Sequence, residues 1–391
     1  MNGEDRIKIM QDKMRGLGLR GALLLYSRNI LYYTGTAQPS YLVILPDDYF
    51  LFVRSGIDFA LNDVFINKDK VKEERRLVNI FKEIFSGPEA ESKTIGTELD
   101  ILTALQFQEI KETFGNYDFL NISPLVLEQR KTKNASEIEK IRKSCDAIHQ
   151  GHEAVLSTLK DGVTELELAA AVENAHRLAG HEGIFFIRQP DFFMSRGPIS
   201  SGANLFKNSG VVYTITGVGL SSSVPAGPSL RRISRGEPVI VDIPTLVEGY
   251  HADQTRTYCV GKAPEAIKSI YTDLKTIADH LISHIKPGMK CSEIYTAAIA
   301  KAKKLGRSEQ FQNFGKGKKS RIIGHGIGLE LNEPPIPSEY DHTEVGEDYV
   351  IALDMHMMDE TAGVVKLEDM ILIGQGCNEI LTKSPRELFE I

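Results

Sequence analysis

Two aspartates lie close together in the segment 239–260, VIVDIPTLVEGYHADQTRTYCV, whose two halves read as strands. The pair at 248–249, Glu-Gly, can form the two-residue turn of a hairpin. With that turn, Asp242 pairs with Thr255, and Asp253 becomes the diagonal neighbour of Asp242 on the same face. Diagonal neighbours lie roughly 7–8 Å apart, so we expect both carboxylates to converge on metal ions.

An aspartate is most often a solvated strand or turn residue. Asp242, however, continues the apolar run 239–241, which reads as a buried strand. A carboxylate in that position must be paired or coordinated to offset its desolvation. Metal binding and simple solvation are both open for these two residues taken alone.

A histidine flanked by glycines follows in the segment Gly324, His325, Gly326, Ile327 and Gly328. The missing side chains let the backbone come close to whatever the imidazole contacts. A dinucleotide-binding GxGxxG loop would require glycine at position 329, which is leucine. A lone histidine is more often a packing residue than a ligand, so this motif also needs companions.

Two further acids interrupt runs that should be buried. Asp354 ends the apolar strand 349–353, and Glu368 lies inside the apolar strand 364–373. Four buried acids would repel one another without cations. Oxygen ligands with one imidazole suit Mn, Co, Fe or Zn, and bridging carboxylates suit a dinuclear centre. We therefore predict two divalent ions, bound by Asp242, Asp253, His325, Asp354 and Glu368.

The elements that must position these residues form an α+β unit. Paired helices come first and an antiparallel set of strands follows, an order typical of this class. The expected helices are 136–159, 164–178, 264–284 and 292–304, and the expected strands are 211–216, 238–242, 250–260, 349–354 and 363–373.

A smaller mixed α/β unit precedes it. It should contain helices at 4–17, 70–85 and 101–114, a buried strand at 21–26, and a hairpin of 41–45 with 49–53. The polar stretch 128–136, EQRKTKNAS, leads into a long helix with Asn134 or Ser136 as its cap. We place the domains at 1–126 and 127–391.

Composition agrees with two soluble domains. The chain has 391 residues, which exceeds the usual size of one core. A net charge of -7 gives no basic surface for nucleic acid or an anionic membrane. The four cysteines form no CxxC pair, and no segment reads as a leader or a membrane span. We expect a cytoplasmic protein that binds neither nucleic acid nor membrane.

Taken together, four motifs resemble the pita-bread metallopeptidase family, which includes methionine aminopeptidase, proline aminopeptidase, prolidase and creatinase. They are RKTKNASEIEKIR at 130–142, the aspartate pair, GHGIGLELNEPP at 324–335 and KLEDMILI at 366–373. The resemblance implies a pita-bread fold behind a creatinase/prolidase-like amino-terminal domain. It also implies a homodimer and a peptide or small amide substrate.

The resemblance further implies that water or hydroxide held between two divalent metals attacks an amide carbonyl. Glu368 would be the bridging carboxylate. Asp354 stands where the family has a glutamate that binds metal and accepts the proton of the water. Asn332 stands where the family has a histidine that stabilises the tetrahedral intermediate. Asp354, Asn332 and Glu368 are therefore the expected catalytic residues.

This sequence departs from the family at several of these positions. Asn332 can donate a hydrogen bond but cannot shuttle a proton near neutral pH. A second family histidine falls at Pro225 or Ala226, neither of which can replace it. Lys366 replaces an arginine of many proline-specific members and loses the planar two-pronged grip on a carboxylate.

The leading hypothesis is an Xaa-Pro aminopeptidase or Xaa-Pro dipeptidase-like hydrolase. A creatinase-like hydrolase or lyase of a small compound is the alternative enzyme, because the missing histidines are compatible with altered chemistry. A non-catalytic binding protein of the same fold is a third hypothesis. His251 and His356, each two residues from a predicted ligand, are candidate auxiliaries for proton transfer.

Overall fold

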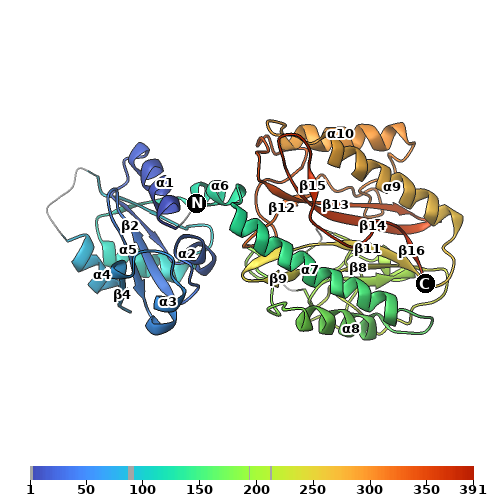
Figure 1. Cartoon of the computed structure of the whole chain (residues 1–391), viewed down its shortest axis with the longest axis horizontal. Coiled ribbons are helices and arrows are strands. Elements are labelled where there is room, and N and C mark those ends of the chain that lie inside the picture. The colour runs from blue at the N-terminus through green and yellow to red at the C-terminus, as the bar shows by residue number, and fades with distance from the viewer. Residues whose placement is uncertain (1–2, 87–91, 193, 212–213) are drawn as a thin grey trace. The chain divides into compact units, whose positions relative to one another are not determined.

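The computed structural model describes residues 3–86, 92–192, 194–211 and 214–391. The chain divides into two compact units, Met1–Arg130 and Lys131–Ile391 (Figure 1). The helix α6 (Ser123–Lys131) contains both this division and the boundary expected from the sequence. No helix in the described ranges is long and apolar enough to cross a membrane.

The first unit is built on a six-stranded mixed sheet in the order β4-β3-β2-β1-β5-β6. Its strands are β1 (Gly21–Leu24), β2 (Ser40–Ile44), β3 (Tyr49–Val53), β4 (Val71–Glu73), β5 (Thr94–Thr97) and β6 (Asp118–Asn121). Its helices are α1 (Gly3–Gly16), α2 (Ser27–Thr34), α3 (Ile57–Asp63), η1 (Lys68–Lys70), α4 (Leu77–Ile84), α5 (Ala104–Phe114) and α6. The apolar strand β1 is buried along its whole length, as a strand between two neighbours should be.

One expected element of this unit is present and another differs. The predicted hairpin is confirmed, because β2 and β3 pair antiparallel with Ile44 opposite Tyr49. The predicted helix 70–85 is wrong in its first half, where β4 pairs parallel to β3 through Leu51 and Val71. Pairing with an existing strand outweighs local helical propensity there, and the helix begins at Leu77.

The second unit contains the longer elements. Its helices are α7 (Ala135–Thr158), α8 (Glu165–Leu178), η2 (Gly202–Phe206), α9 (Glu265–His284) and α10 (Cys291–Lys304). Its strands are β7 (Ile199–Ser201), β8 (Pro238–Asp242), β9 (Thr245–Val247), β10 (Tyr250–Ala252), β11 (Thr255–Cys259), β12 (His325–Gly326), β13 (Val350–Asp359), β14 (Gly363–Leu372), β15 (Glu379–Ile380) and β16 (Phe389–Glu390). Asn134 caps α7 through a capping box with Glu137, which confirms one of the two predicted caps.

One large sheet runs in the order β12-β13-β14-β11-β8-β7, while β9 and β10 form a separate two-stranded sheet. The expected strand 250–260 is therefore broken at Asp253 and Gln254, between β10 and β11. The expected strand 211–216 is not formed at 211 and 214–216, and 212–213 lie outside the described residues. There the Thr216 hydroxyl and carbonyl bond to Ser209 and Ser200 instead of joining a strand ladder.

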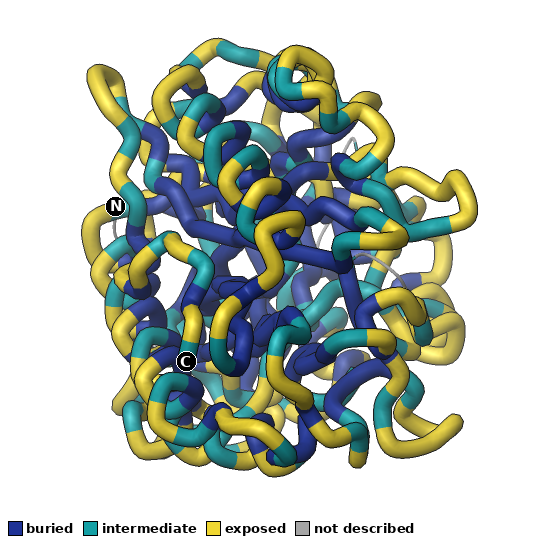
Figure 2. Tube along the Cα trace, turned by 90° about the vertical axis from the view of Figure 1, so that its right-hand side faces the viewer, coloured by how far each residue is buried: buried dark blue, intermediate teal, exposed yellow. Residues whose placement is uncertain are grey.

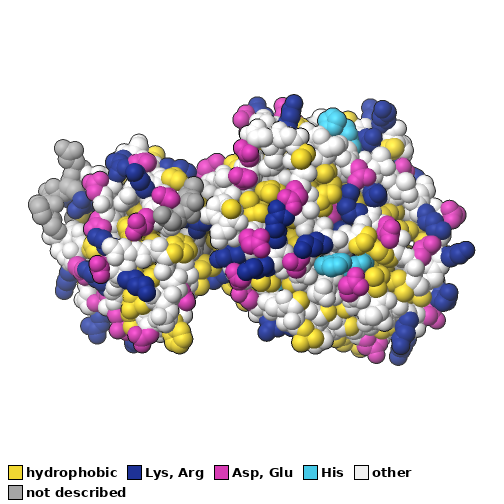
Figure 3. Space-filling model, viewed as in Figure 1, with side chains coloured by type: hydrophobic (Ala, Val, Ile, Leu, Met, Phe, Trp, Pro, Cys, Tyr) yellow, Lys and Arg dark blue, Asp and Glu magenta, His cyan; other side chains and the backbone are white. Residues whose placement is uncertain are grey.

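Helices cover this sheet through two separate apolar clusters. Helices α9 and α10 pack on β13 and β14 through residues such as Leu274 and Leu353. Helices α7 and α8 pack near β8 and β11 through residues such as Leu168 and Tyr258. Figure 2 shows the buried segments gathered inside the exposed turns. On the face drawn in Figure 3, acidic and basic side chains are interspersed.

Candidate metal centre

The hairpin that carries the two aspartates has the register expected from its turn. Asp242 on β8 pairs with Thr255 on β11. Glu248 and Gly249 both have positive φ, 50° and 80°, as the two central residues of a type I′ turn require. The turn residues therefore determine which residues of β8 and β11 face each other, and Asp253 lies just before β11.

Strand pairing extends this register into a row of polar residues across four strands. Thr255 on β11 is opposite Glu368 on β14, and Glu368 is opposite Asp354 on β13. Asp242 completes the row on β8. Directly opposed residues share one face of a sheet, so three acids from separate parts of the chain meet on one surface.

Alternation along the strands separates this face from the apolar core. On β13, Leu353 and Met355 belong to the cluster beneath α9 and α10, so Asp354 between them faces the other way. On β14, Leu367 belongs to the same cluster, which places Lys366 and Glu368 on the opposite face. The acids interrupt apolar runs because the strands have two different faces.

His325 joins this face from the edge strand β12. It pairs with Ala352, which lies two residues from Asp354 and therefore on the same side of β13. The positions next to it need small residues, because a Cβ on Gly324 would lie 2.3 Å from the Ala352 carbonyl oxygen. Gly324 thus allows the strand carrying His325 to approach β13 closely.

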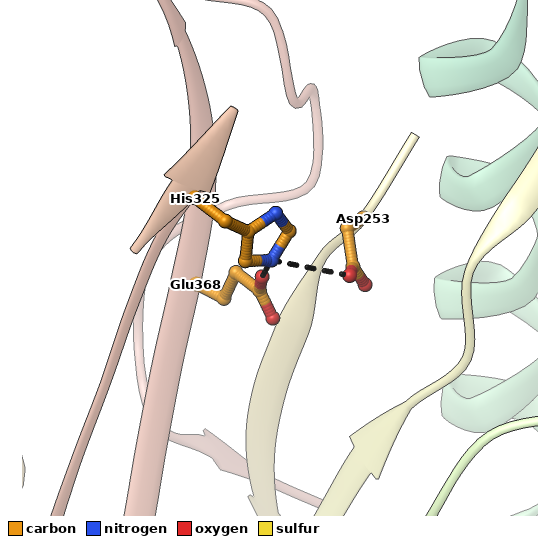
Figure 4. Close-up of side chains that lie close together, drawn as sticks. All are labelled: Asp253, His325 and Glu368. Carbon is orange, nitrogen blue, oxygen red and sulfur yellow. Dashed lines mark ion pairs between the residues drawn. The ribbon is translucent and has the colours of Figure 1, made fainter. Parts of the chain in front are cut away.

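Asp253, His325 and Glu368 form a group that could hold a metal ion (Figure 4). One ligand atom from each lies within 4.8 Å of the others. The His325 Nε2 atom is 3.9 Å from Asp253 Oδ2 and 3.7 Å from Glu368 Oε1. His325 Nδ1 lies 3.0 Å from the Gly326 carbonyl oxygen, a contact that places the ring proton on Nδ1. That tautomer leaves Nε2 as a lone-pair donor toward a cation.

Three carboxylate oxygens of this region are buried without a hydrogen-bond donor. They are Asp253 Oδ1, Glu368 Oε1 and Asp354 Oδ1, of which Asp354 Oδ1 lies 3.1 Å from the Lys366 ammonium. A buried ionised oxygen with no donor is costly unless a cation binds it. The oxygen and imidazole donors of the Asp253, His325 and Glu368 group therefore fit a divalent transition-metal ion.

Asp242 and Asp354 lie beside this group and contact the ammonium of Lys366. Lys366 Nζ is 2.5 Å from Asp242 Oδ2, 3.1 Å from Asp354 Oδ1 and 3.2 Å from Glu368 Oε2. The sequence indicated Lys366 only as a replacement for arginine. The sequence did contain a signal. Lys366 lies in an apolar strand, two residues from the predicted ligand Glu368 and hence on the same face.

The pKa values of these groups reflect burial and crowding of like charges. Burial raises the pKa of Asp253 well above its usual range, and Glu368 and Asp242 raise it further. Burial also raises the pKa of Asp354 to about 7. At Glu368 burial acts in the same direction, but the Lys366 ammonium and His325 outweigh it and lower the pKa to about 2. One ammonium is too little positive charge for four carboxylates.

The other positions named from the sequence have their own surroundings. Asn332 is half-buried. The backbone carbonyl of Pro225 accepts hydrogen bonds from Gly219 and Ser209, and that of Ala226 accepts one from Ser195. Pro225 and Ala226 therefore serve the local loop through their backbone.

The two auxiliary histidine candidates already have backbone partners. His251 Nε2 accepts a hydrogen bond from the Phe186 amide, and Nδ1 contacts the Gly328 carbonyl oxygen at 2.9 Å. His356 Nε2 lies 3.1 Å from the Asn313 carbonyl oxygen. Burial, reinforced by Lys366, lowers the pKa of His356 to about 3. These contacts assign both rings to holding loops in place.

A buried ion-pair network, which the sequence did not indicate, connects the strands on the face of the sheet opposite the candidate metal centre. The Arg256 guanidinium bonds Asp369 Oδ1 at 2.7 Å and also the backbone carbonyls of Thr255 and Glu368. Arg386 Nε holds the other carboxylate oxygen of Asp369 at 2.5 Å. Because Thr255 and Glu368 belong to the polar row, this network fixes β11 against β14 at the site.

Comparisons with known proteins agree with this architecture. The Xaa-Pro dipeptidase of Pyrococcus furiosus is 28% identical over 367 residues, covering 92% of each chain. The crystal structure of the prolidase from Pyrococcus horikoshii superposes with a TM-score of 0.81 at 26% identity, over 98% of this chain and 99% of that one. The Xaa-Pro dipeptidase from Bacillus anthracis has the same fold, with a TM-score of 0.84 at 22% identity over all of both chains.

Two family models match the chain. Residues 6–132 match the creatinase/prolidase N-terminal domain, and residues 139–375 match metallopeptidase family M24. The expected α+β fold, a pita-bread domain after a smaller amino-terminal domain, is confirmed. The chain belongs to metallopeptidase family M24.

Proposed function

We propose that this protein is a metal-dependent peptidase that hydrolyses the bond between an amino acid and a following proline, with Xaa-Pro dipeptides as its main substrates. The observation that carries the proposal is the group of Asp253, His325 and Glu368 with its buried acceptor oxygens. Relatives that cover more than nine tenths of the chain and are named Xaa-Pro dipeptidase support the substrate class.

The metal ligands are proposed to come from the five residues expected from the sequence. Asp253, His325 and Glu368 would hold a divalent ion directly, and Asp242 and Asp354 line the adjoining position. When bound, such an ion polarises the scissile carbonyl and increases the acidity of water. Mn, Co, Fe and Zn all suit one imidazole with carboxylates.

The protein groups around the ion have separate proposed roles. Asp354 Oδ1 is directly across the strand pair from Glu368 and would accept the proton released by the attacking water. The Asn332 amide would donate a hydrogen bond to the oxygen of the tetrahedral intermediate. Glu368 would hold the ion together with His325 of β12 and Asp253, which precedes β11.

The test is peptide hydrolysis by protein stripped with a chelator and reloaded separately with Mn, Co, Fe or Zn. Xaa-Pro dipeptides should be cleaved, Xaa-Pro-Xaa tripeptides more slowly, and dipeptides without proline hardly at all. His325→Ala should lose at least 100-fold in kcat/KM, whereas His342→Ala, a change at an exposed histidine, should retain activity. Faster cleavage of tripeptides would favour an aminopeptidase.

Failure of every loaded form on all proline peptides would exclude the proposed substrate class. Turnover of small non-peptide amides by the same samples would then favour the creatinase-like alternative. Metal content must be measured in each sample, so that inactivity caused by an empty site is recognised.

A homodimer and a cytoplasmic location belong to the same proposal. All four cysteines are free, three of them buried, which fits a reducing compartment. Light scattering coupled to size exclusion should give a mass near twice 43.5 kDa. A mass of one chain at micromolar concentration would contradict the dimer.

A further inference from the structure

We infer that the Lys366 ammonium is a built-in cation of this centre, occupying the position of a second metal ion, so that the protein binds one divalent ion per chain. The inference rests on the proposed metal-dependent function and revises its expected stoichiometry.

The geometry around Lys366 is that of a complete ammonium site. Its three carboxylate partners come from three strands, β8, β13 and β14, at distances of 2.5, 3.1 and 3.2 Å. An ammonium has three N–H donors and no acceptor. Asp242 and Glu368 accept hydrogen bonds from the ammonium, and Asp354 lies at ion-pair distance from it.

The surroundings hold the side chain in this place. Lys366 is fully buried, and the hydroxyl of Thr257 bonds both its backbone N–H and its backbone carbonyl. Neighbours on the same face include the apolar Ile240, Met358 and Val364. Withdrawing the ammonium from the carboxylates would move a charge toward apolar side chains, which is costly.

A second metal ion would need the same oxygen atoms. An ion held by Asp242 and Glu368 would compete with Lys366 for these carboxylates, because the ammonium bonds Asp242 Oδ2 and Glu368 Oε2. Thr255 Oγ1 also donates to Glu368 Oε2 at 2.9 Å. Metal–oxygen bonds of about 2.0–2.2 Å leave no room for an ammonium on the same side of these oxygens.

The oxygens left without donors lie on the other side. Asp253 Oδ1 and Glu368 Oε1 have no hydrogen bond, and the His325 Nε2 atom faces the same group. The ammonium thus bonds Glu368 Oε2, and Glu368 Oε1 would be available to one metal ion.

The decisive measurement is the number of ions bound to the wild-type chain. Chelator-stripped protein, saturated with Mn²⁺ and freed of excess ion, should contain one manganese per chain by elemental analysis. Its electron paramagnetic resonance spectrum should show an isolated Mn²⁺ ion. Two ions per chain with an exchange-coupled spectrum would overturn the inference.

The matched variants are Lys366→Met and Lys268→Met. Methionine keeps the length of the side chain but removes the cation, so Lys366→Met should bind two manganese ions and give a coupled spectrum. Lys268→Met, which removes an ammonium from a part-exposed ion pair on α9, should bind one. A folded Lys366→Met protein with a single ion would contradict the inference, and if that variant does not fold, the wild-type count decides.

These results separate the inference from the proposed function. Two ions with turnover of Xaa-Pro peptides would overturn only the inference. One ion without turnover would overturn only the proposed function. A wild-type chain that binds none of Mn²⁺, Co²⁺, Fe²⁺ and Zn²⁺ would overturn both the stoichiometry and the metal dependence.

Discussion

At the scale of single residues, the candidate metal centre depends on which hydrogen-bond donors and cations contact each carboxylate oxygen. Glu368 Oε2 receives the Thr255 hydroxyl and the Lys366 ammonium, whereas Oε1 receives no donor. Side chains that orient a ligand in this way typically change metal affinity when they are removed. Thr255 is thus a positioning residue for Glu368.

Replacing Thr255 with valine should weaken Mn²⁺ binding by about 10- to 100-fold, because Glu368 loses the hydrogen bond that orients it. Competition with a chromophoric chelator measures the change. Thr97→Val is the matched control, since Thr97 is buried and donates to the Leu23 carbonyl in the other unit. An unchanged Mn²⁺ affinity in Thr255→Val would show that Thr255 does not position Glu368.

At the scale of elements, buried polar contacts lock helices and strands around the site. Asp369 lies on the helix-facing side of β14. Arg256 from β11 donates to its Oδ1 atom, and Arg386 donates to its Oδ2 atom. Arg386 also pairs with the part-exposed Asp279 on α9. The same carboxylate therefore ties a strand pair to a later segment of the chain.

Asp369→Asn should destabilise the second unit by about 3–5 kcal/mol, because it leaves the buried Arg256 guanidinium without its anion. Urea unfolding measures the loss. Asp279→Asn, at the more exposed end of the same network, should cost about 1 kcal/mol or less. Equal effects of the two substitutions would show that burial does not control the strength of this network.

Helix α7 packs on the sheet through a histidine. His152 Nδ1 lies 2.8 Å from the Tyr258 hydroxyl, and its ring packs against Phe389. Burial, with His149 and Arg256 adding to it, lowers the pKa of His152 from 6.5 to about 4. The fold therefore holds this imidazole in its neutral form.

As the pH falls from about 6.5 to about 4, the unfolded chain takes up a proton at His152 that the folded chain does not bind. The free energy of unfolding should therefore decrease across this window, by on the order of 3 kcal/mol from this group, and level off below it. Denaturant unfolding at several pH values measures the slope. His152→Gln should lower that slope, and an identical slope in both proteins would contradict the assignment.

At the scale of the whole molecule, all the candidate ligands lie in one of two units with separate cores. The aromatic and aliphatic core of the first unit includes Phe52 and Phe114, and the second unit has its own clusters beneath its helices. A ligand that binds only the folded second unit stabilises that unit through mass action.

Saturating Mn²⁺ should raise the unfolding temperature of the second unit, since an ion at 100 times its Kd adds about 2.7 kcal/mol. Scanning calorimetry with and without a chelator tests this. The shift should vanish in His325→Ala, and any resolved transition of the first unit should not move. A shift that persists in His325→Ala would place the stabilising ion elsewhere.

Sequence alone determined the local parts of this site. Positive-φ residues at the turn set the register of Asp242 with Thr255, and each acid in an apolar run indicated a polar face on a buried strand. The glycines around His325 indicated close backbone approach, which the contact with β13 explains. These features follow from neighbours in the chain, so their physical causes are visible in the sequence.

Only the tertiary structure determined which segments distant in the sequence contact one another. The pairing of β11 with β14, and the break between β10 and β11, depend on which strands come together in space. The ion pair of Lys366 with Asp242 and the backbone contacts of His251 and His356 involve residues remote in the sequence. No local pattern specifies these contacts, because they follow from the register between strands that the whole sheet establishes.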